Sequence, residues 1–190
     1  MRSAYLFVFL LVSTTAWAQT PDTNAYTSSI RQQNRRITQI VVRAAEKVPE
    51  DLYAFKPTPE VRSFAEILGH IVDAHYLLCR AAHENIFEIT REYELKPGTK
   101  ASLIEALKQS IAYCEQAFDS TTDANGTTPV KLGGSSAPKL MVLNSNMAHT
   151  WEHYGNLVTY MRLKGIVPPT SEGTKPVPAG RHDGGSAQLR

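Results

Sequence analysis

The chain has 190 residues, of which 42% are hydrophobic and 20% charged, and its formal net charge is +2. Once a short leader is set aside, this length suits one domain with a full-sized core. The near-balanced charge excludes the strongly basic footprint of a nucleic-acid-binding domain, so we expect no nucleic-acid partner.

Residues 1–18 have the three parts of a secretory signal peptide. Arg2 gives a basic start, an apolar run covers residues 5–12, and Ala-Trp-Ala at 16–18 is a small-x-small cleavage site. The apolar run is shorter than the roughly 20 residues that span a bilayer, so it does not predict a transmembrane anchor. We predict cleavage before Gln19, export to the periplasm or the extracellular space, and no transmembrane segment in the mature chain.

The first predicted helix follows a polar stretch, residues 19–27, which we expect to be disordered. Over about 28–47, apolar residues recur at heptad-like spacing and describe one buried stripe. The members of this stripe are Ile30, Ile37, Val41, Ala44 and Val48. Residues 49–62 contain three prolines and form a connector, which Tyr53 and Phe55 are placed to pin to the rest of the fold.

The second predicted helix opens at Ser63, because Glu66 three residues later completes a capping box. Its apolar pattern continues to about Glu84. The third helix follows the break at 97–98 (Pro-Gly). A second Ser-x-x-Glu box, at 102–105, marks its start. Its stripe consists of Leu103, Leu107, Ile111, Cys114 and Phe118.

Residues 119–138 are rich in Asp, Asn, Gly, Thr, Ser and Pro, which predicts a long surface loop and no strand. The fourth helix is expected over about 139–164, ended by Gly165 and the following prolines. Residues 170–190 form a flexible tail. Four amphipathic helices over 28–169, with one long connection before the last, predict an all-α four-helix bundle.

Two cysteines remain in the mature chain, Cys79 and Cys114. An exported chain could oxidise them. Both lie within apolar helical patterns, however, where a cysteine usually acts as a small hydrophobic residue. This favours two unpaired buried thiols over a disulfide.

The clearest chemical signal is a histidine pair, His149 and His153, one turn apart on the fourth helix. Imidazoles at this spacing can bind one transition metal through ring nitrogens. His70 lies on the apolar stripe of the second helix and is the candidate third ligand. His75 lies about 140° around that helix from His70, so the two cannot point at one metal. The alternative is that these histidines are core residues held by hydrogen bonds.

Polar residues share the inward face of the fourth helix with the histidine pair. They are Asn146, Asn156 and Tyr160, and such residues need partners or a function. The sequence from His149 to His153 also matches the inverted zincin pattern H-x-x-E-H, with Glu152 as the base. The chain offers no acidic third ligand downstream outside the tail. We therefore expect Glu152 to hold a metal-bound water, to make an outer contact, or to face solvent.

At this point the chain resembles a known family. Residues 64–71 (Phe-Ala-Glu-Ile-Leu-Gly-His-Ile) resemble the first metal motif of DinB-like proteins, also called DinB/YfiT-like metalloenzymes. Residues 149–156 and 160–169, with His-x-x-x-His-Tyr-Gly-Asn and then Tyr-Met-Arg-x-x-Gly-x-x-Pro-Pro, resemble the closing signature of that family. The resemblance implies a four-helix bundle in which His70, His149 and His153 bind a divalent metal, zinc or nickel.

Relatives in this family include thiol-dependent transferases and isomerases, in which the metal activates a small thiol. The resemblance therefore implies a metal-dependent hydrolase or thiol transferase acting on an unidentified small molecule. Glu152, Asn156 and Tyr160 are the residues we expect to orient the ligand or the substrate. The alternative is a metal-binding or interaction protein without turnover. A homodimer is compatible with either, and predicted export sets this chain apart from cytoplasmic relatives that use thiol cofactors.

Overall fold

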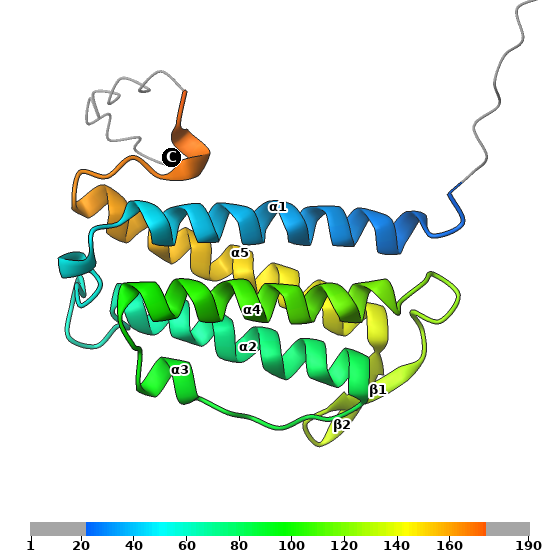
Figure 1. The fold of residues 1–190 in the computed structure, drawn as a ribbon. Coiled ribbons are helices and arrows are strands. Elements are labelled where there is room, and N and C mark those ends of the chain that lie inside the picture. Colours follow the sequence, from blue (N-terminus) through cyan, green and yellow to red (C-terminus); the bar gives the residue numbers. More distant parts are fainter. Residues whose placement is uncertain (1–21, 174–190) are drawn as a thin grey trace, which may run out of the picture.

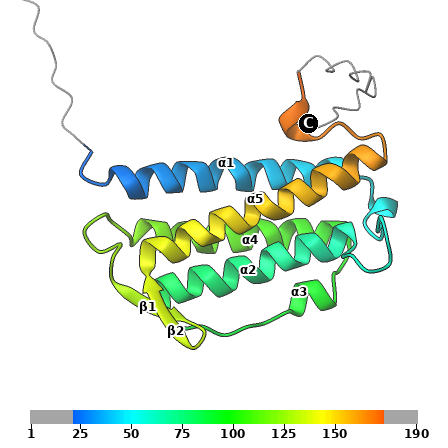
Figure 2. The same ribbon diagram turned by 180° about the vertical axis from the view of Figure 1, so that it is seen from behind.

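The computed structural model describes residues 22–173, so the predicted signal peptide and most of the predicted tail lie outside the described part. Four long helices pack side by side as a bundle (Figure 1). They are α1 (Ala25–Lys47), α2 (Phe64–Glu84), α4 (Lys100–Asp119) and α5 (Lys139–Leu163). Seen from behind, α5 runs obliquely between α1 and α2 (Figure 2). The predicted all-α four-helix bundle is confirmed.

Shorter elements connect these helices. They are η1 (Glu50–Leu52), α3 (Glu92–Leu95), β1 (Pro129–Leu132), β2 (Ser135–Pro138) and η2 (Pro169–Ser171). The sequence did not predict α3, because four residues carry too little periodicity to be recognised. This element matters for function, since it lies along α2 beside the candidate site.

The periodic apolar positions form the core that holds the bundle together. On α1, Ile37, Val41 and Ala44 are fully buried. Leu68 and Ile71 on α2 and Leu107 on α4 are equally buried and pack in the same cluster. Each large side chain removed from water in this way stabilises the fold by roughly 1.5–3 kcal/mol.

The starts of α2 and α4 test the two predicted capping boxes. The box at the start of α2 is confirmed, because the Ser63 hydroxyl accepts from the Glu66 amide while the Glu66 carboxylate accepts from the Ser63 amide. The second box is wrong. Helix α4 begins at Lys100, and the Thr99 side chain accepts from the Ser102 amide at 3.2 Å. Thr99 therefore does the work assigned to Ser102, one turn earlier.

The first helix begins at Ala25, three residues before the predicted start. The expectation of disorder is therefore wrong for residues 25–27. Thr27 is buried, and its amide and hydroxyl donate to Asp123 Oδ1 at 2.8 and 2.7 Å. Asp123 comes from the connection before α5, so a contact distant in sequence satisfies residues that look like a polar leader.

The connection before α5 contains an antiparallel hairpin, which corrects the expectation of a loop without strands. In β1 and β2, Val130 pairs with Ala137, and both are buried against the bundle. The turn is formed by Gly133 and Gly134, and Gly133 has a φ of +61°, a conformation that glycine adopts without strain. Glycine pairs favour two-residue hairpin turns, so the signal was present in the sequence.

The cysteines are paired, which corrects the expectation of free thiols. Cys79 on α2 and Cys114 on α4 are buried and form a disulfide with 5.1 Å between their Cα atoms. Each stripe had placed its cysteine toward the core, but a stripe does not say which residue of another helix it faces. One turn before this bond on both helices, His75 on α2 meets Ser110 on α4.

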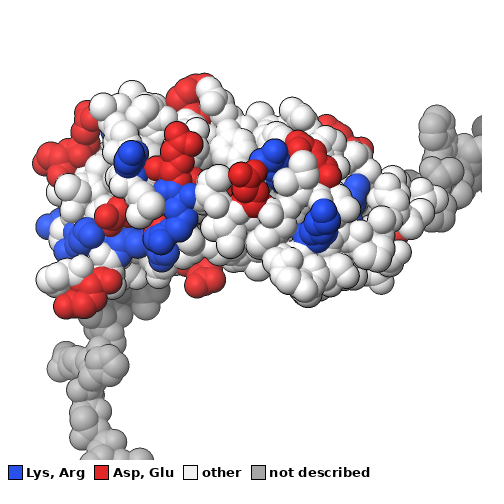
Figure 3. Space-filling model, turned by 90° about the horizontal axis from the view of Figure 1, so that it is seen from below, with Lys and Arg blue, Asp and Glu red and all other residues white. Residues whose placement is uncertain are grey.

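The surface carries both signs of charge. On the face seen in Figure 3, basic side chains lie among acidic ones. Some charges of the molecule are paired, as where Arg31 and Arg35 on α1 both contact Glu115 on α4. Within residues 22–173, no helix combines the length and the apolarity needed to cross a bilayer.

Candidate metal centre

The histidine pair on α5 lies as its spacing predicts. His149 and His153 are one turn apart, and their Nε2 atoms are 3.0 Å from each other. Helix α5 buries Leu143, Leu157 and Met161 in the core. Since α5 packs against α2, this anchoring holds the two imidazoles toward α2.

His70 completes a triad from the facing helix. Its Nε2 lies 3.1 Å from Nε2 of His149, and its ring centroid is 4.7 Å from that of His153. The three potential ligand atoms all lie within 4.8 Å of one another. The structure therefore brings the three sequence-predicted ligands to one point between α2 and α5.

The donor set fits a divalent transition metal. Nε2 of His149 lies within hydrogen-bond distance of two other imidazole nitrogens, yet a neutral imidazole has one N–H to give. Hydrogen bonds alone therefore leave this arrangement incomplete. Two ligands at about 2.0–2.1 Å from a tetrahedral metal are about 3.3–3.4 Å apart. The observed separations of 3.0 and 3.1 Å are close to that spacing.

The outer nitrogen of His70 is held by Glu94, a residue that the sequence did not single out. Nδ1–H of His70 donates to Glu94 Oε2 at 2.9 Å, which leaves Nε2 free to bind a metal. Glu94 also accepts from Arg91 at 2.7 Å and from Arg62 at 2.8 Å. The hydrogen bond from Arg91, followed by those from Arg62 and His70, lowers the pKa of Glu94 to about 2, against the effect of burial.

Glu94 reaches His70 because α3 lies unusually close to α2. A Cβ atom on Gly69 would be 2.2 Å from the carbonyl oxygen of Tyr93, so any other residue at position 69 would push α3 away. Asp73, one turn after Gly69, accepts from the amides of Tyr93 and Glu94 at 3.3 and 2.9 Å. The glycine and the carboxylate on α2 together fix the backbone that presents Glu94.

The two histidines of α5 are kept neutral. Burial is the main cause that lowers the pKa of His153 to about 3, and the neighbouring imidazoles add to it. Burial, then His70, lowers the pKa of His149 as well. A neutral imidazole is the form that binds metal, so these environments favour coordination.

Asn156 contacts the outer nitrogen of His153, with its Nδ2 placed 3.3 Å from Nδ1. Turning the amide over would instead present its oxygen to an N–H at this position. Asn156 was expected from the sequence to orient the ligand or the substrate, and the structure places it beside His153, one of the predicted ligands.

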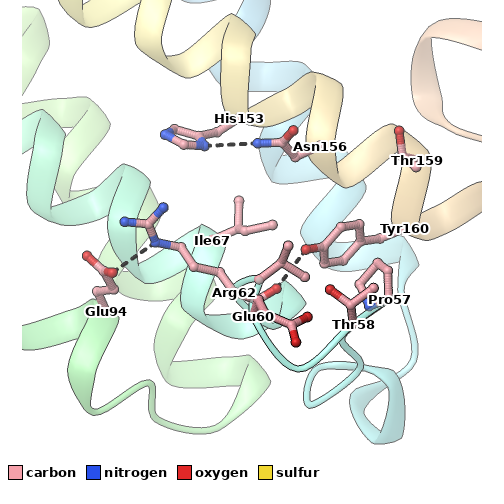
Figure 4. Close-up of a pocket in the computed structure, with 11 residues that line it drawn as sticks. Pro57, Thr58, Glu60, Arg62, Ile67, Glu94, His153, Asn156, Thr159 and Tyr160 are labelled. Atoms are coloured by element: carbon pink, nitrogen blue, oxygen red, sulfur yellow. Dashed lines mark hydrogen bonds and ion pairs between the residues drawn. The ribbon is translucent and has the colours of Figure 1, made fainter.

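A pocket of about 630 Å³ opens beside the triad (Figure 4). Among the three histidines, His153 lines it, together with Arg62, Glu94, Asn156 and Tyr160. This volume lies in the range of sites for small molecules.

The other two residues expected to act at the site, Tyr160 and Glu152, do not contact the predicted ligands in the way that Asn156 does. Tyr160 forms part of the pocket wall, and its hydroxyl donates to the carbonyl oxygen of Arg62 at 2.7 Å. Its proton is therefore committed to the backbone. Glu152 is exposed on α5 and does not line the pocket, which is the solvent-facing alternative considered for it.

His75 points away from the triad, as its position around the helix predicts. It is fully buried, with Nδ1 3.0 Å from the Ser110 hydroxyl and Nε2 3.1 Å from the Thr150 hydroxyl. Burial lowers its pKa to about 3. His75 is thus a core residue whose two nitrogens both have partners.

Comparisons with known proteins identify the family and support the fold. The family model described as the DinB superfamily matches residues 33–157. A crystal structure of a DinB-like protein from Bacillus cereus is similar with a TM-score of 0.65 and 18% identity, over 75% of this chain and 95% of that one. A DinB-like protein from Bacillus subtilis gives a TM-score of 0.57 and 21% identity, over 76% and 94% of the two chains.

A third similar structure is a mycothiol-dependent maleylpyruvate isomerase. It shares 14% identity with a TM-score of 0.60, and the match covers 69% of this chain and 60% of the isomerase chain. No curated protein matches the sequence significantly. At these identities, the similar structures establish the fold.

Proposed function

The chain belongs to the DinB superfamily, and from this premise we propose that it is an exported metal-dependent hydrolase of a small molecule. The observation that carries the proposal is the convergence of three imidazole Nε2 atoms beside a pocket of about 630 Å³. His70, His149 and His153 would hold one divalent ion, zinc or nickel.

Three histidine ligands are typical of catalytic rather than structural zinc, which usually has four protein ligands. Such an ion, when bound, supplies Lewis acidity and lowers the pKa of a coordinated water or thiol. Within the described residues, no further histidine, cysteine or carboxylate joins the triad as a candidate ligand. This supports a catalytic site over a purely structural one.

The chain itself would position the ligands and shape the pocket. Glu94 fixes the ring of His70 by accepting from Nδ1–H, and Asn156 contacts Nδ1 of His153. Tyr160 closes one side of the pocket and ties its hydroxyl to the backbone of the loop before α2. Figure 4 shows Glu94, Asn156 and Tyr160 around the same opening, contributed by α3 and α5.

The disulfide favours hydrolysis over thiol chemistry. Disulfides such as Cys79–Cys114 persist in oxidising compartments, where reduced small thiols are scarce. The same bond supports export, together with the leader predicted at residues 1–18. A thiol transferase is the second candidate, and the structural similarity to the mycothiol-dependent isomerase is the observation that favours it.

Metal analysis tests the centre directly. Protein purified without an affinity tag and incubated with zinc or nickel should retain about one equivalent, and His153→Ala should retain under about a tenth. His75→Gln is the matched control, because it changes a buried histidine outside the triad. Equal metal contents in wild type and His153→Ala would contradict the proposal.

Activity and processing complete the test. Loaded protein should hydrolyse members of a panel of ester, amide, lactone and phosphoester substrates, and a chelator should abolish the activity. Transfer of a small thiol without hydrolysis would favour the second candidate, and inactivity on both panels would favour the non-catalytic alternative. Mass spectrometry of the protein secreted by an expressing bacterium should find Gln19 at its N-terminus.

A further inference from the structure

Arg62 occupies a distinctive place at the pocket. It lies just before α2, in a backbone position fixed by the hydrogen bond from Tyr160 to its carbonyl oxygen. Its side chain is 40% exposed and lines the pocket together with His153. A guanidinium so placed is available to a ligand in the pocket.

Glu94 is hydrogen-bonded to only one of the three nitrogens of this guanidinium. Arg62 donates to Glu94 through Nε at 2.8 Å, and within residues 22–173 its two terminal nitrogens have no acceptor. Figure 4 shows these terminal nitrogens turned from Glu94 toward the side on which His153 lies. The free edge carries the paired N–H groups that bind a carboxylate with two parallel hydrogen bonds.

The local charge balance leaves Arg62 incompletely neutralised. Glu94 is shared with Arg91, which donates to it through both Nε and Nη2. One carboxylate thus faces two guanidinium groups, and only Arg62 of the two lines the pocket. Glu60 also lines the pocket, but it is fully exposed and accepts from Thr58 in its own loop.

One part of the pocket lining is apolar. Pro57, Val61 and Ile67 form it, and the ring of Tyr160 closes the side nearest the loop. A ligand that fits these surroundings carries an anionic group at one end and an apolar body at the other. A phosphate without such a body would leave this apolar part uncovered.

We propose that Arg62 is the anion-binding residue of the pocket and that the site takes a small organic carboxylate with an apolar body. This inference rests on the proposed function, because it names the substrate class of the same pocket. It adds a specificity-determining residue, and the anion preference belongs to the protein's own side chains.

Benzoate and its uncharged isostere benzamide are suitable probes, titrated by calorimetry into the full mature chain with and without zinc. Wild type should bind benzoate at least about tenfold more tightly than benzamide, since a charged hydrogen-bonded pair contributes at this level. Arg62→Gln should abolish the preference for benzoate. Arg62→Lys should keep part of this preference, since lysine retains the positive charge but not the paired N–H groups of the guanidinium.

Arg91→Gln is the matched control. It removes the other arginine that contacts Glu94 but leaves the pocket lining intact, so the preference for benzoate should stay within about threefold of wild type. An unchanged preference in Arg62→Gln, or an equal loss in Arg91→Gln, would overturn the inference. So would wild-type protein that binds the two probes equally.

Zinc content, measured on the same samples, keeps the two proposals apart. A chain that retains no zinc after incubation with it, yet still prefers benzoate through Arg62, would disprove the metal proposal and uphold the anion site. A chain that binds zinc and has no preference would do the reverse.

Discussion

Two histidine regions lie on the same helices and differ in how their nitrogens are satisfied. His75 on α2 has a hydroxyl at each nitrogen, from Ser110 on α4 and Thr150 on α5. His70, five residues earlier on α2, has a carboxylate at Nδ1 and another imidazole at Nε2. Thr150 and His149, adjacent on α5, serve the two regions separately.

The comparison shows what distinguishes a structural histidine from a candidate ligand. A hydroxyl can donate or accept, so one of the two can accept from the N–H of His75 while the other donates to the bare nitrogen in place of its own backbone carbonyl. Three imidazoles that face one another cannot satisfy one another in this way with one N–H each, because Nε2 of His149 lies 3.1 Å from that of His70 and 3.0 Å from that of His153. A metal cation could bind the facing nitrogens of the triad, whereas both nitrogens of His75 already have hydroxyl partners.

Removing one triad member should break this contrast most severely. His149→Ala should reduce zinc retention from about one equivalent to under about a tenth, because two remaining imidazoles make a weak site. His75→Gln should retain about one equivalent while losing thermal stability. Metal analysis after gel filtration provides the measurement, and zinc loss in His75→Gln as complete as in His149→Ala would erase the distinction.

Opening the disulfide should weaken the region around His75 and spare the triad. The double substitution Cys79→Ala and Cys114→Ala should lower the free energy of unfolding by about 2–4 kcal/mol. Its zinc affinity at 25 °C should stay near that of wild type, because neither cysteine touches the three ligands. Urea denaturation and competition with a chelator measure the two quantities, and a fall in both would show that the regions are coupled.

Replacing Glu94 should affect zinc binding at the triad without removing a ligand. Glu94→Gln should weaken zinc binding by about 10–100-fold, because His70 loses the charged acceptor that fixes its ring and tautomer. Glu92→Gln is the matched control, as Glu92 is exposed on the same short helix. Competition titrations separate the two, and equal affinities would assign Glu94 to helix packing alone.

The smallest expected effect is the pH dependence of stability that His75 causes. His75 is neutral in the folded state, with a pKa near 3, and near 6.5 when unfolded. Below pH 6.5 His75 therefore binds a proton in the unfolded chain but not in the folded one. The free energy of unfolding thus decreases as the pH is lowered from 6.5 toward 3. From pH 6.5 to 5.5 this costs about 1 kcal/mol. In urea with a chelator, wild type should lose that much more stability than His75→Gln over the same range, and parallel losses would contradict the assignment.

The sequence was most informative where many residues repeat one pattern. The four long helices follow from apolar positions such as Val41 and Leu107, whose burial the structure confirms. The convergence of His70 with the pair on α5 was anticipated from helical spacing and from the family resemblance. These predictions succeed because local periodicity determines which side of a helix faces the core.

The sequence was least informative where one contact joins distant segments. Glu94 lies 24 residues beyond His70 on a four-residue helix, and its role depends on a close backbone approach at Gly69. The pairing of Cys79 with Cys114 likewise depends on how α2 lies against α4. Neither relation has a local pattern, since each is fixed by tertiary packing.

The disulfide also closes a ring in the covalent chain. The segment from Asn85 to Arg91 lies within this ring and is largely exposed, so it is a natural site for a protease to cut. A single cut there would leave His70 on one fragment and His149 and His153 on the other, still joined through sulfur. The nicked molecule would keep every member of the triad and would separate into two pieces only after reduction.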